Sequence, residues 1–197
     1  MEMKQALAGA AAEKRGQKTK DLVLVGMFAA VLAVVSQISI PMPSGVPVTI
    51  QVFGIALVGA VLGWKRGLLA VVVYILIGAA GVPVFANFRG GLQVLTGMTG
   101  GYILAWPVMA VLCGICPRLE NKALGLAVRM VLAVMGLMVV ETVGGLQWSL
   151  LAGDRSLGAI MAYSFVAFIP KDLVLTVVAV VFGDQVRKPL VKAGYRD

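Results

Sequence analysis

Residues 81–102 read GVPVFANFRGGLQVLTGMTGGY and interrupt a chain that is otherwise strongly apolar. The stretch combines many glycines with an asparagine, an arginine, a glutamine and three aromatic side chains. Glycine allows backbone conformations closed to other residues and lets the chain approach a ligand closely. We therefore expect a loop between two apolar helices that folds back over a pocket for a small solute. Glycines that serve only tight turns are the alternative.

The rest of the chain has the composition of an integral membrane protein. Of the 197 residues, 60% are hydrophobic and 13% are charged, whereas soluble domains average about 25% charged residues. A spanning helix needs about 20 predominantly apolar residues. The sequence therefore predicts an all-α integral membrane protein with six transmembrane helices, at 21–40, 49–63, 67–82, 97–116, 123–147 and 170–188.

The segments outside these helices complete the expected organisation. Residues 1–20 are expected to form a basic cytoplasmic tail, 21–190 the six-helix membrane domain, and 191–197 a cytoplasmic C-terminal tail. Residues 64–67 read WKRG and predict a tight basic turn. Residues 149–169 are interpreted as a partly buried connection. Pro170 is then expected to open the last helix, where its missing N–H is harmless.

The basic residues predict how the chain is oriented. Most of the 17 lysines and arginines lie in the two tails and in the turns at 64–67 and 117–122. Such residues concentrate on the cytoplasmic side of membrane proteins. We therefore expect both termini in the cytoplasm and the loop 81–102 outside. On this interpretation the net charge of +8 reflects the lipid bilayer and not a nucleic-acid partner.

The residue inventory argues against an enzyme. The chain has no histidine, which removes Ser-His triads and most zinc hydrolases. It also lacks the phosphate-binding loop of nucleotide hydrolases. We therefore expect no catalytic residue, no metal and no cofactor. Cys113 and Cys116 have a C-x-x-C spacing that is compatible with redox chemistry or half a zinc site, but their place in an apolar helix favours two small buried residues.

Polar residues in or beside apolar segments are candidates for function, because charges are costly in a membrane. Arg89 offers a planar fork that suits a carboxylate, and Asn87 offers both a donor and an acceptor. Asp172 either binds a ligand or favours the positive end of the last helix. Lys171 either joins the site or balances Asp172. Glu141 is a further candidate, with a structural pairing favoured.

Two groups of apolar residues complete the candidates. Small residues four apart, here Ala29 and Ala33, let helices approach closely in lipid, either for a partner or for internal packing. Aromatic residues are expected to wall the pocket, and these are Phe85, Phe88, Tyr102 and Trp148.

Ordered motifs give the sequence a family resemblance. From Thr19 to Val186 it carries, in order, P-V-T-x-Q, L-G-x-K-R-G, G-x-P-V-F, G-G and G-x-T-G-G-Y, followed by FIPKDLVLTVVAVV. Together these resemble the BioY family. BioY is the substrate-binding membrane subunit, or S component, of the biotin transporter in the energy-coupling-factor (ECF) class.

The resemblance implies a function, partners and residue roles. It implies a multi-pass protein of a prokaryotic cell membrane that captures biotin outside, beneath loops following helices one and three. It further implies docking through Ala29 and Ala33 onto a transmembrane coupling subunit that carries two ABC-type ATPases. Asp172 would accept hydrogen bonds from the ureido N–H groups of biotin, and Asn87 would contact the same ureido group. Arg89 would hold the valerate carboxylate.

One departure leaves a role open. Family members often read P-G-D-L-x-K, whereas Leu175 stands here at the lysine position and Lys171 precedes the aspartate. Either Arg89 holds the carboxylate alone or Lys171 helps. An S component for another vitamin is the main alternative function, and a membrane-embedded enzyme is a weaker one.

Overall fold

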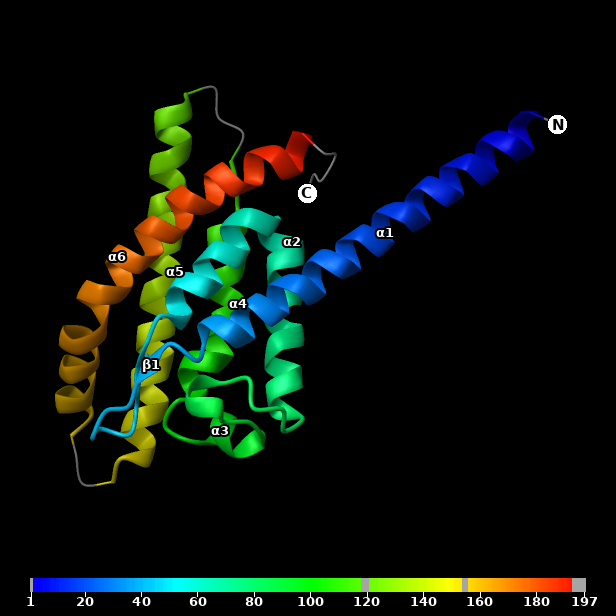
Figure 1. Cartoon of the computed structure of the whole chain (residues 1–197). Coiled ribbons are helices and arrows are strands. Elements are labelled where there is room, and N and C mark those ends of the chain that lie inside the picture. The colour runs from blue at the N-terminus through cyan, green and yellow to red at the C-terminus, as the bar shows by residue number, and fades with distance from the viewer. Residues whose placement is uncertain (1, 118–120, 154–155, 193–197) are drawn as a thin grey trace.

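The computed structural model describes residues 2–117, 121–153 and 156–192, and it is almost entirely helical. The long helices are α1 (Glu2–Val35), α2 (Gln51–Ala79), α4 (Gly100–Gly114), α5 (Lys122–Leu151) and α6 (Leu157–Lys192). Shorter elements fill the connections: β1 (Ser39–Ile40), β2 (Val48–Thr49), the 3-10 turn η1 (Ala86–Phe88) and α3 (Leu92–Thr96). Strands β1 and β2 pair antiparallel, with Ser39 opposite Thr49. Figure 1 shows the hairpin and α3 at one end of the bundle.

Helix α2 consists of two arms that meet at Gly63. This glycine has φ 79° and ψ 175°, so the helix is interrupted there. In Figure 1 the chain of α2 rises, turns and descends. The arms correspond to the predicted helices at 49–63 and 67–82. The turn was predicted at 64–67 and instead forms at Gly63, because a backbone of this shape is open almost only to glycine.

The core lies where α2 packs against α1, α4 and α6, and where α5 packs against α4 and α6. Small residues bring the helices together. A methyl group on Gly59 would lie 2.4 Å from the carbonyl oxygen of Ala110, and one on Gly183 would lie 2.7 Å from the Cβ atom of Ala60. Close approach of this kind is the usual basis of helix packing in lipid.

The outer surface of the helices is apolar. Val131 and Met135 of α5 and Val174 and Phe182 of α6 are each at least half exposed. Among the described residues, three helices are long and apolar enough to cross a membrane, namely α2, α5 and α6, and α4 is a shorter apolar helix. An all-α, multi-pass membrane protein is the fold that this surface and these lengths indicate.

The N-terminal part of the chain differs from the prediction. Residues 2–20 were expected as a separate tail, but they belong to the 34-residue helix α1. Figure 1 shows this part of α1 extending away from the other helices. The helix ends at Val35 and not at residue 40. The hairpin that follows contains Pro41 and Pro43, and proline cannot continue a helix without losing a hydrogen bond.

The last helix also differs. Residues 157–169 were expected as a connection, yet α6 runs continuously from Leu157 to Lys192 with Pro170 inside it. Thirteen apolar residues are too short to span alone, but joined to the following segment they form one long helix. Figure 1 shows α6 changing direction along its length, which is the usual effect of an internal proline. Asp172 therefore lies inside a helix and not at a helix start.

The break at Gly63 generates a stability prediction. Replacing Gly63 with alanine places a Cβ atom on a backbone shape that costs roughly 1–3 kcal/mol. We expect G63A to lower the melting temperature of the purified protein in detergent. The control is G26A, because Gly26 lies in α1 with no atom within 4 Å of an added Cβ. Equal melting temperatures of G63A and G26A would contradict this role of Gly63.

Candidate functional site

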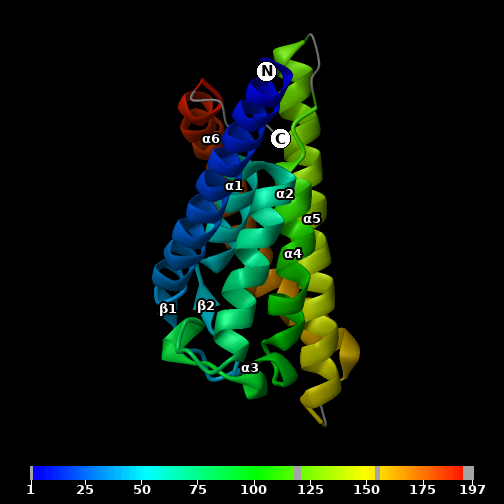
Figure 2. The same cartoon turned by 90° about the vertical axis from the view of Figure 1, so that its right-hand side faces the viewer.

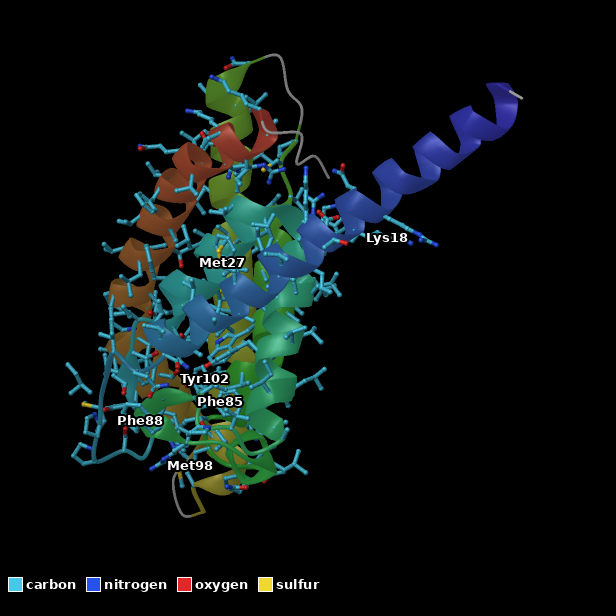
Figure 3. The ribbon with its side chains drawn as sticks, turned by 45° about the vertical axis from the view of Figure 1, so that its right-hand side comes forward. Lys18, Met27, Phe85, Phe88, Met98 and Tyr102 are labelled. Atoms are coloured by element: carbon cyan, nitrogen blue, oxygen red, sulfur yellow. The ribbon has the colours of Figure 1, made fainter. Side chains whose placement is uncertain are left out.

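A cavity opens at the end of the bundle that carries the hairpin and α3. Figure 2 shows the strands and α3 at this end, next to α2 and α4. In Figure 3, Phe85, Phe88, Met98 and Tyr102 gather here, far from Lys18. Polar and charged side chains line the cavity together with aromatic ones: Thr49, Gln51, Asn87, Arg89, Thr99, Glu141, Lys171 and Asp172, with Phe85, Tyr102, Trp106 and Phe168.

The acidic part of the wall comes from α6. Asp172 is 3% exposed, and its Oδ1 accepts a hydrogen bond from the ammonium group of Lys171. The same ammonium donates to the carbonyl oxygen of Thr49 over 2.7 Å. Lys171 therefore ties α6 to β2 and fixes one oxygen of Asp172, and no hydrogen bond is recorded to Oδ2 among the described residues.

A second buried acid takes part in a chain of hydrogen bonds across three helices. Glu141 of α5 is 1% exposed, and its Oε2 accepts from the hydroxyl of Ser164 over 3.0 Å. That hydroxyl is 2.8 Å from the hydroxyl of Tyr102. The three side chains come from α5, α6 and α4. The structural pairing expected for Glu141 is therefore present, and Glu141 also lines the cavity.

The roof of the cavity carries Asn87 and Arg89. Asn87 has φ 58°, a left-handed conformation that asparagine tolerates better than most residues. Its Oδ1 accepts from the hydroxyl of Ser39 over 2.9 Å, which leaves its amide N–H groups for a ligand. Arg89 is exposed at the mouth. Within the described ranges, no hydrogen bond or ion pair joins its guanidinium to another group.

The end of α1 and the second arm of α2 hold this roof in place. Gln37 donates to the carbonyl oxygen of Phe85 over 3.2 Å and accepts from the N–H of Phe88 over 3.0 Å. The carbonyl oxygen of Val84 accepts from Ser36 and, over 3.0 Å, from the hydroxyl of Tyr74. These contacts position Asn87 and Arg89, which follow directly in the sequence.

Two aromatic rings of the wall pack directly on glycines. A methyl group on Gly78 would lie 2.2 Å from the ring of Phe85, and one on Gly144 would lie 2.2 Å from the ring of Tyr102. Phe85 meets Tyr74 edge-on with ring centroids 5.6 Å apart. The ring of Tyr102 meets Phe168 edge-on at 6.2 Å. Close packing therefore holds both rings of the apolar wall in place.

The structure brings together most of the predicted site residues, and these are Phe85, Asn87, Arg89, Tyr102, Lys171 and Asp172. Phe88 and Trp148 do not line this cavity. Phe88 is 73% exposed and has a left-handed backbone, with a φ of 55°. Trp148 is 2% exposed and packs edge-on against Tyr163 between α5 and α6. Their place in the pocket wall was predicted wrongly.

The small residues of α1 lie against the core. Ala29 is 3% exposed and belongs to the core, and Ala33 packs against the same core. The internal packing left open for these residues is therefore what the structure shows. Within residues 21–35 of α1, the exposed small residues are Gly26 and Ala30. Cys113 is buried and Cys116 half-buried, both as free thiols.

Sequence reasoning left several wall residues unassigned. Gln51, Thr49, Trp106 and Phe168 all line the cavity. Two of them stand in the motif P-V-T-x-Q at residues 47–51, which was available as a signal. Nothing local marks Trp106 or Phe168, because a single aromatic residue in an apolar helix is indistinguishable from ordinary core. Across the described residues, no group of His, Cys, Asp or Glu side chains is arranged to hold a metal ion.

The comparison with protein families decides the classification. A sequence model described as the BioY family matches residues 3–192. The chain belongs to the BioY family. The family is one of transporters and not of enzymes, as the names of the relatives below show.

Individual BioY relatives cover almost the same length. A probable biotin transporter BioY of Pyrococcus horikoshii is 36% identical over 86% of this chain and 98% of its own. The biotin transporter BioY of Thermotoga maritima is 38% identical over 86% of this chain and 96% of its own. A solved structure described as the S component for biotin from an ECF-type ABC transporter shares 27% identity and a TM-score of 0.75, covering 88% of this chain and 93% of that one.

The roof contacts generate a prediction about local stability. Gln37→Ala removes the acceptor of the Phe88 N–H and the donor to Phe85. Each such bond contributes about 1 kcal/mol. We therefore expect hydrogen exchange at the amide of Phe88 to become roughly tenfold faster.

The matched control for this experiment is Gln93→Ala. The recorded side-chain bond of Gln93 is local, to the carbonyl oxygen of Gly90 over 2.7 Å. Hydrogen exchange followed by mass spectrometry over residues 84–90 distinguishes the variants. Unchanged exchange in Q37A would show that Gln37 does not hold the roof.

Proposed function

We propose that this BioY protein is the substrate-capture subunit that binds biotin in the cavity, for ATP-driven uptake with ECF partner subunits. The observation that carries the proposal is one cavity in which an unpartnered guanidinium at the mouth and a buried carboxylate in the wall are joined by aromatic walls. Biotin is a rigid bicycle with a ureido group at one end and a carboxylate on an aliphatic chain at the other. Relatives of nearly equal length are named biotin transporters.

The ureido ring is assigned to the buried end. Its N–H groups need acceptors, and Asp172 offers Oδ2 while Lys171 holds Oδ1. The Lys171 ammonium pairs with one oxygen of this carboxylate, and the ureido N–H groups would donate to the other. Asn87 is a second contact to the same ring, because Ser39 fixes its Oδ1 and leaves its N–H groups for the ureido oxygen.

The carboxylate is assigned to the mouth. Arg89 is exposed there, and guanidinium groups bind carboxylates through two parallel hydrogen bonds. Lys171 is already engaged with Thr49 and Asp172. We therefore assign the carboxylate to Arg89 and a positioning role to Lys171. The thiophane ring and aliphatic chain would pack against Phe85 and Tyr102.

The orientation in the membrane follows from the distribution of charge. Figure 1 shows the beginning of α1 and the end of α6 away from the hairpin and α3. Lys65 and Arg66 follow the turn of α2, and Arg187, Lys188 and Lys192 lie near the end of α6. Because basic residues concentrate on the cytoplasmic side, we place both termini in the cytoplasm of a prokaryotic cell and the cavity outside.

The proposed assembly rests on membership of the BioY family and on the similarity to a biotin S component. A transmembrane coupling subunit and two ABC-type ATPases would complete the transporter, and no cofactor is assigned beyond the transported biotin. Copurification with a tagged chain and ATP-dependent biotin uptake test the assembly. Binding of labelled biotin to the purified chain tests capture. Competition by a panel of vitamins distinguishes biotin from the alternative of another vitamin, which would displace the label more strongly than biotin does.

The first binding prediction concerns Arg89. A hydrogen bond to a charged group contributes about 1.5–3 kcal/mol, so Arg89→Ala should weaken biotin binding by roughly 10- to 100-fold. Biotin amide lacks the carboxylate and should lose much less. The control is Arg15→Ala, an exposed arginine outside the cavity. Equal losses for biotin and biotin amide would reject Arg89 as the carboxylate anchor.

The second binding prediction concerns Asp172. Asp172→Asn keeps the shape but replaces a charged acceptor, so binding of biotin and biotin amide should weaken together by roughly tenfold or more. Asp184→Asn, on the same helix but outside the cavity, should leave affinity unchanged. Calorimetric titration of both variants, with melting temperatures to check folding, provides the measurement. Wild-type affinity in D172N would remove Asp172 from the site.

A further inference from the structure

A second, basic cleft lies at the opposite end of the bundle, where α5 begins and α6 ends. Arginine and lysine side chains line it together with apolar ones, and the lining residues that matter here are Leu126, Arg129, Arg187, Lys188, Val191 and Lys192. None of them lines the cavity assigned to biotin.

Arg129 is the buried centre of this cleft. Its side chain is 9% exposed, and its Nη1 donates to Oδ1 of Asp184 over 2.6 Å. Its Nε and Nη2 are buried without a hydrogen-bond partner among the described residues. Buried donors of a charged group are costly when they are unsatisfied. Within the described residues, the guanidinium of Arg129 therefore has two donors without an acceptor, and the same side chain lines the cleft.

The charges around Arg129 favour an anion. Arg187, Lys188 and Lys192 bring three more positive charges to the lining, against the one negative charge of Asp184. Asp184 is shared, because Lys188 also approaches its Oδ2, at 3.6 Å. Arg187 is partly engaged, since its Nη1 donates to the carbonyl oxygen of Ala60 over 3.5 Å. The described lining residues carry four positive charges, on Arg129, Arg187, Lys188 and Lys192, and one negative charge, on Asp184.

The apolar surroundings identify the source of the anion. Leu126 is 43% exposed beside Arg129, and Val191 belongs to the same lining. Farther along the two helices, Val131 and Val181 face outward, 59% and 43% exposed. A phosphate with attached acyl chains would satisfy both features, because its headgroup meets the cations while its chains run along α5 and α6.

We propose that this cleft binds the phosphate group of an anionic phospholipid. The phosphate accepts hydrogen bonds from Nε and Nη2 of Arg129, and Lys188 and Lys192 neutralise its charge from the rim. With the termini in the cytoplasm, the cleft faces the leaflet that carries anionic lipids. The site would anchor the ends of α5 and α6 to the membrane surface while the opposite end of the bundle captures ligand.

The test uses the full chain, delipidated in detergent and titrated with phosphatidylglycerol, and compares matched double variants. Lys188→Gln/Lys192→Gln removes the rim charges and spares the buried ion pair of Arg129. Lys18→Gln/Lys20→Gln removes two exposed lysines of α1. Each lysine near a lipid surface contributes about 1 kcal/mol. The rim variant, which loses two lysines, should therefore weaken phosphatidylglycerol binding by roughly 30-fold, and the α1 variant should bind like the wild type.

Further arms identify the ligand. Phosphatidylcholine should bind much more weakly than phosphatidylglycerol. Inorganic phosphate alone should also bind much more weakly than phosphatidylglycerol. Equal losses in both double variants, or equal binding of the two lipids, would overturn the proposal. Binding of inorganic phosphate as tight as that of phosphatidylglycerol would identify the ligand as a soluble anion. That result would also overturn the proposal. Arg129→Gln should abolish the preference for phosphatidylglycerol, and biotin binding by the rim variant should remain that of the wild type.

Discussion

The structure depends on how a membrane protein can keep a carboxylate in its interior. Asp172 is 3% exposed within a helix whose outer face is apolar, and charges in such a place are expensive unless they are paired. Lys171 provides the pairing, and its ammonium also binds the carbonyl oxygen of Thr49. The lysine therefore stabilises the acid and joins α6 to the hairpin in one contact. One carboxylate oxygen remains for a ligand, which makes this pair the fixed point of the proposed site.

A few hydrogen bonds hold the roof of the cavity in place. In the chain from Val84 to Arg89 only Phe85 is buried in the core, and hydrogen bonds from Ser36, Gln37 and Tyr74 hold the backbone. A segment held by a few hydrogen bonds opens more readily than a packed helix does. A cavity with closely packed aromatic walls and a hydrogen-bonded roof fits a protein that must admit a ligand and then hold it. The proposed lipid cleft also contains a polar group that is only partly paired. There, Nε and Nη2 of the buried Arg129 have no hydrogen-bond partner among the described residues.

Much of this arrangement is accessible from the sequence. The helical spans follow from apolar length, the position of the loop from its glycines, and Asn87, Arg89 and Asp172 from the rarity of polar residues in such a chain. The misplaced features share a different cause. The continuity of α6 through Pro170 and the burial of Ala29 and Trp148 depend on which helices pack together, and spacing along the chain does not report that. The left-handed backbone at Phe88 and the break of α2 at Gly63 are local conformations that spacing does not report either.

The central claim is that one cavity grips biotin between Asp172 and Arg89. The most direct test is an experimentally determined structure of the purified chain with biotin bound. We predict the ureido ring within hydrogen-bond distance of Asp172 and Asn87, the bicycle against Phe85 and Tyr102, and the carboxylate on Arg89. Biotin bound in the reverse orientation, or bound outside this cavity, would contradict the account.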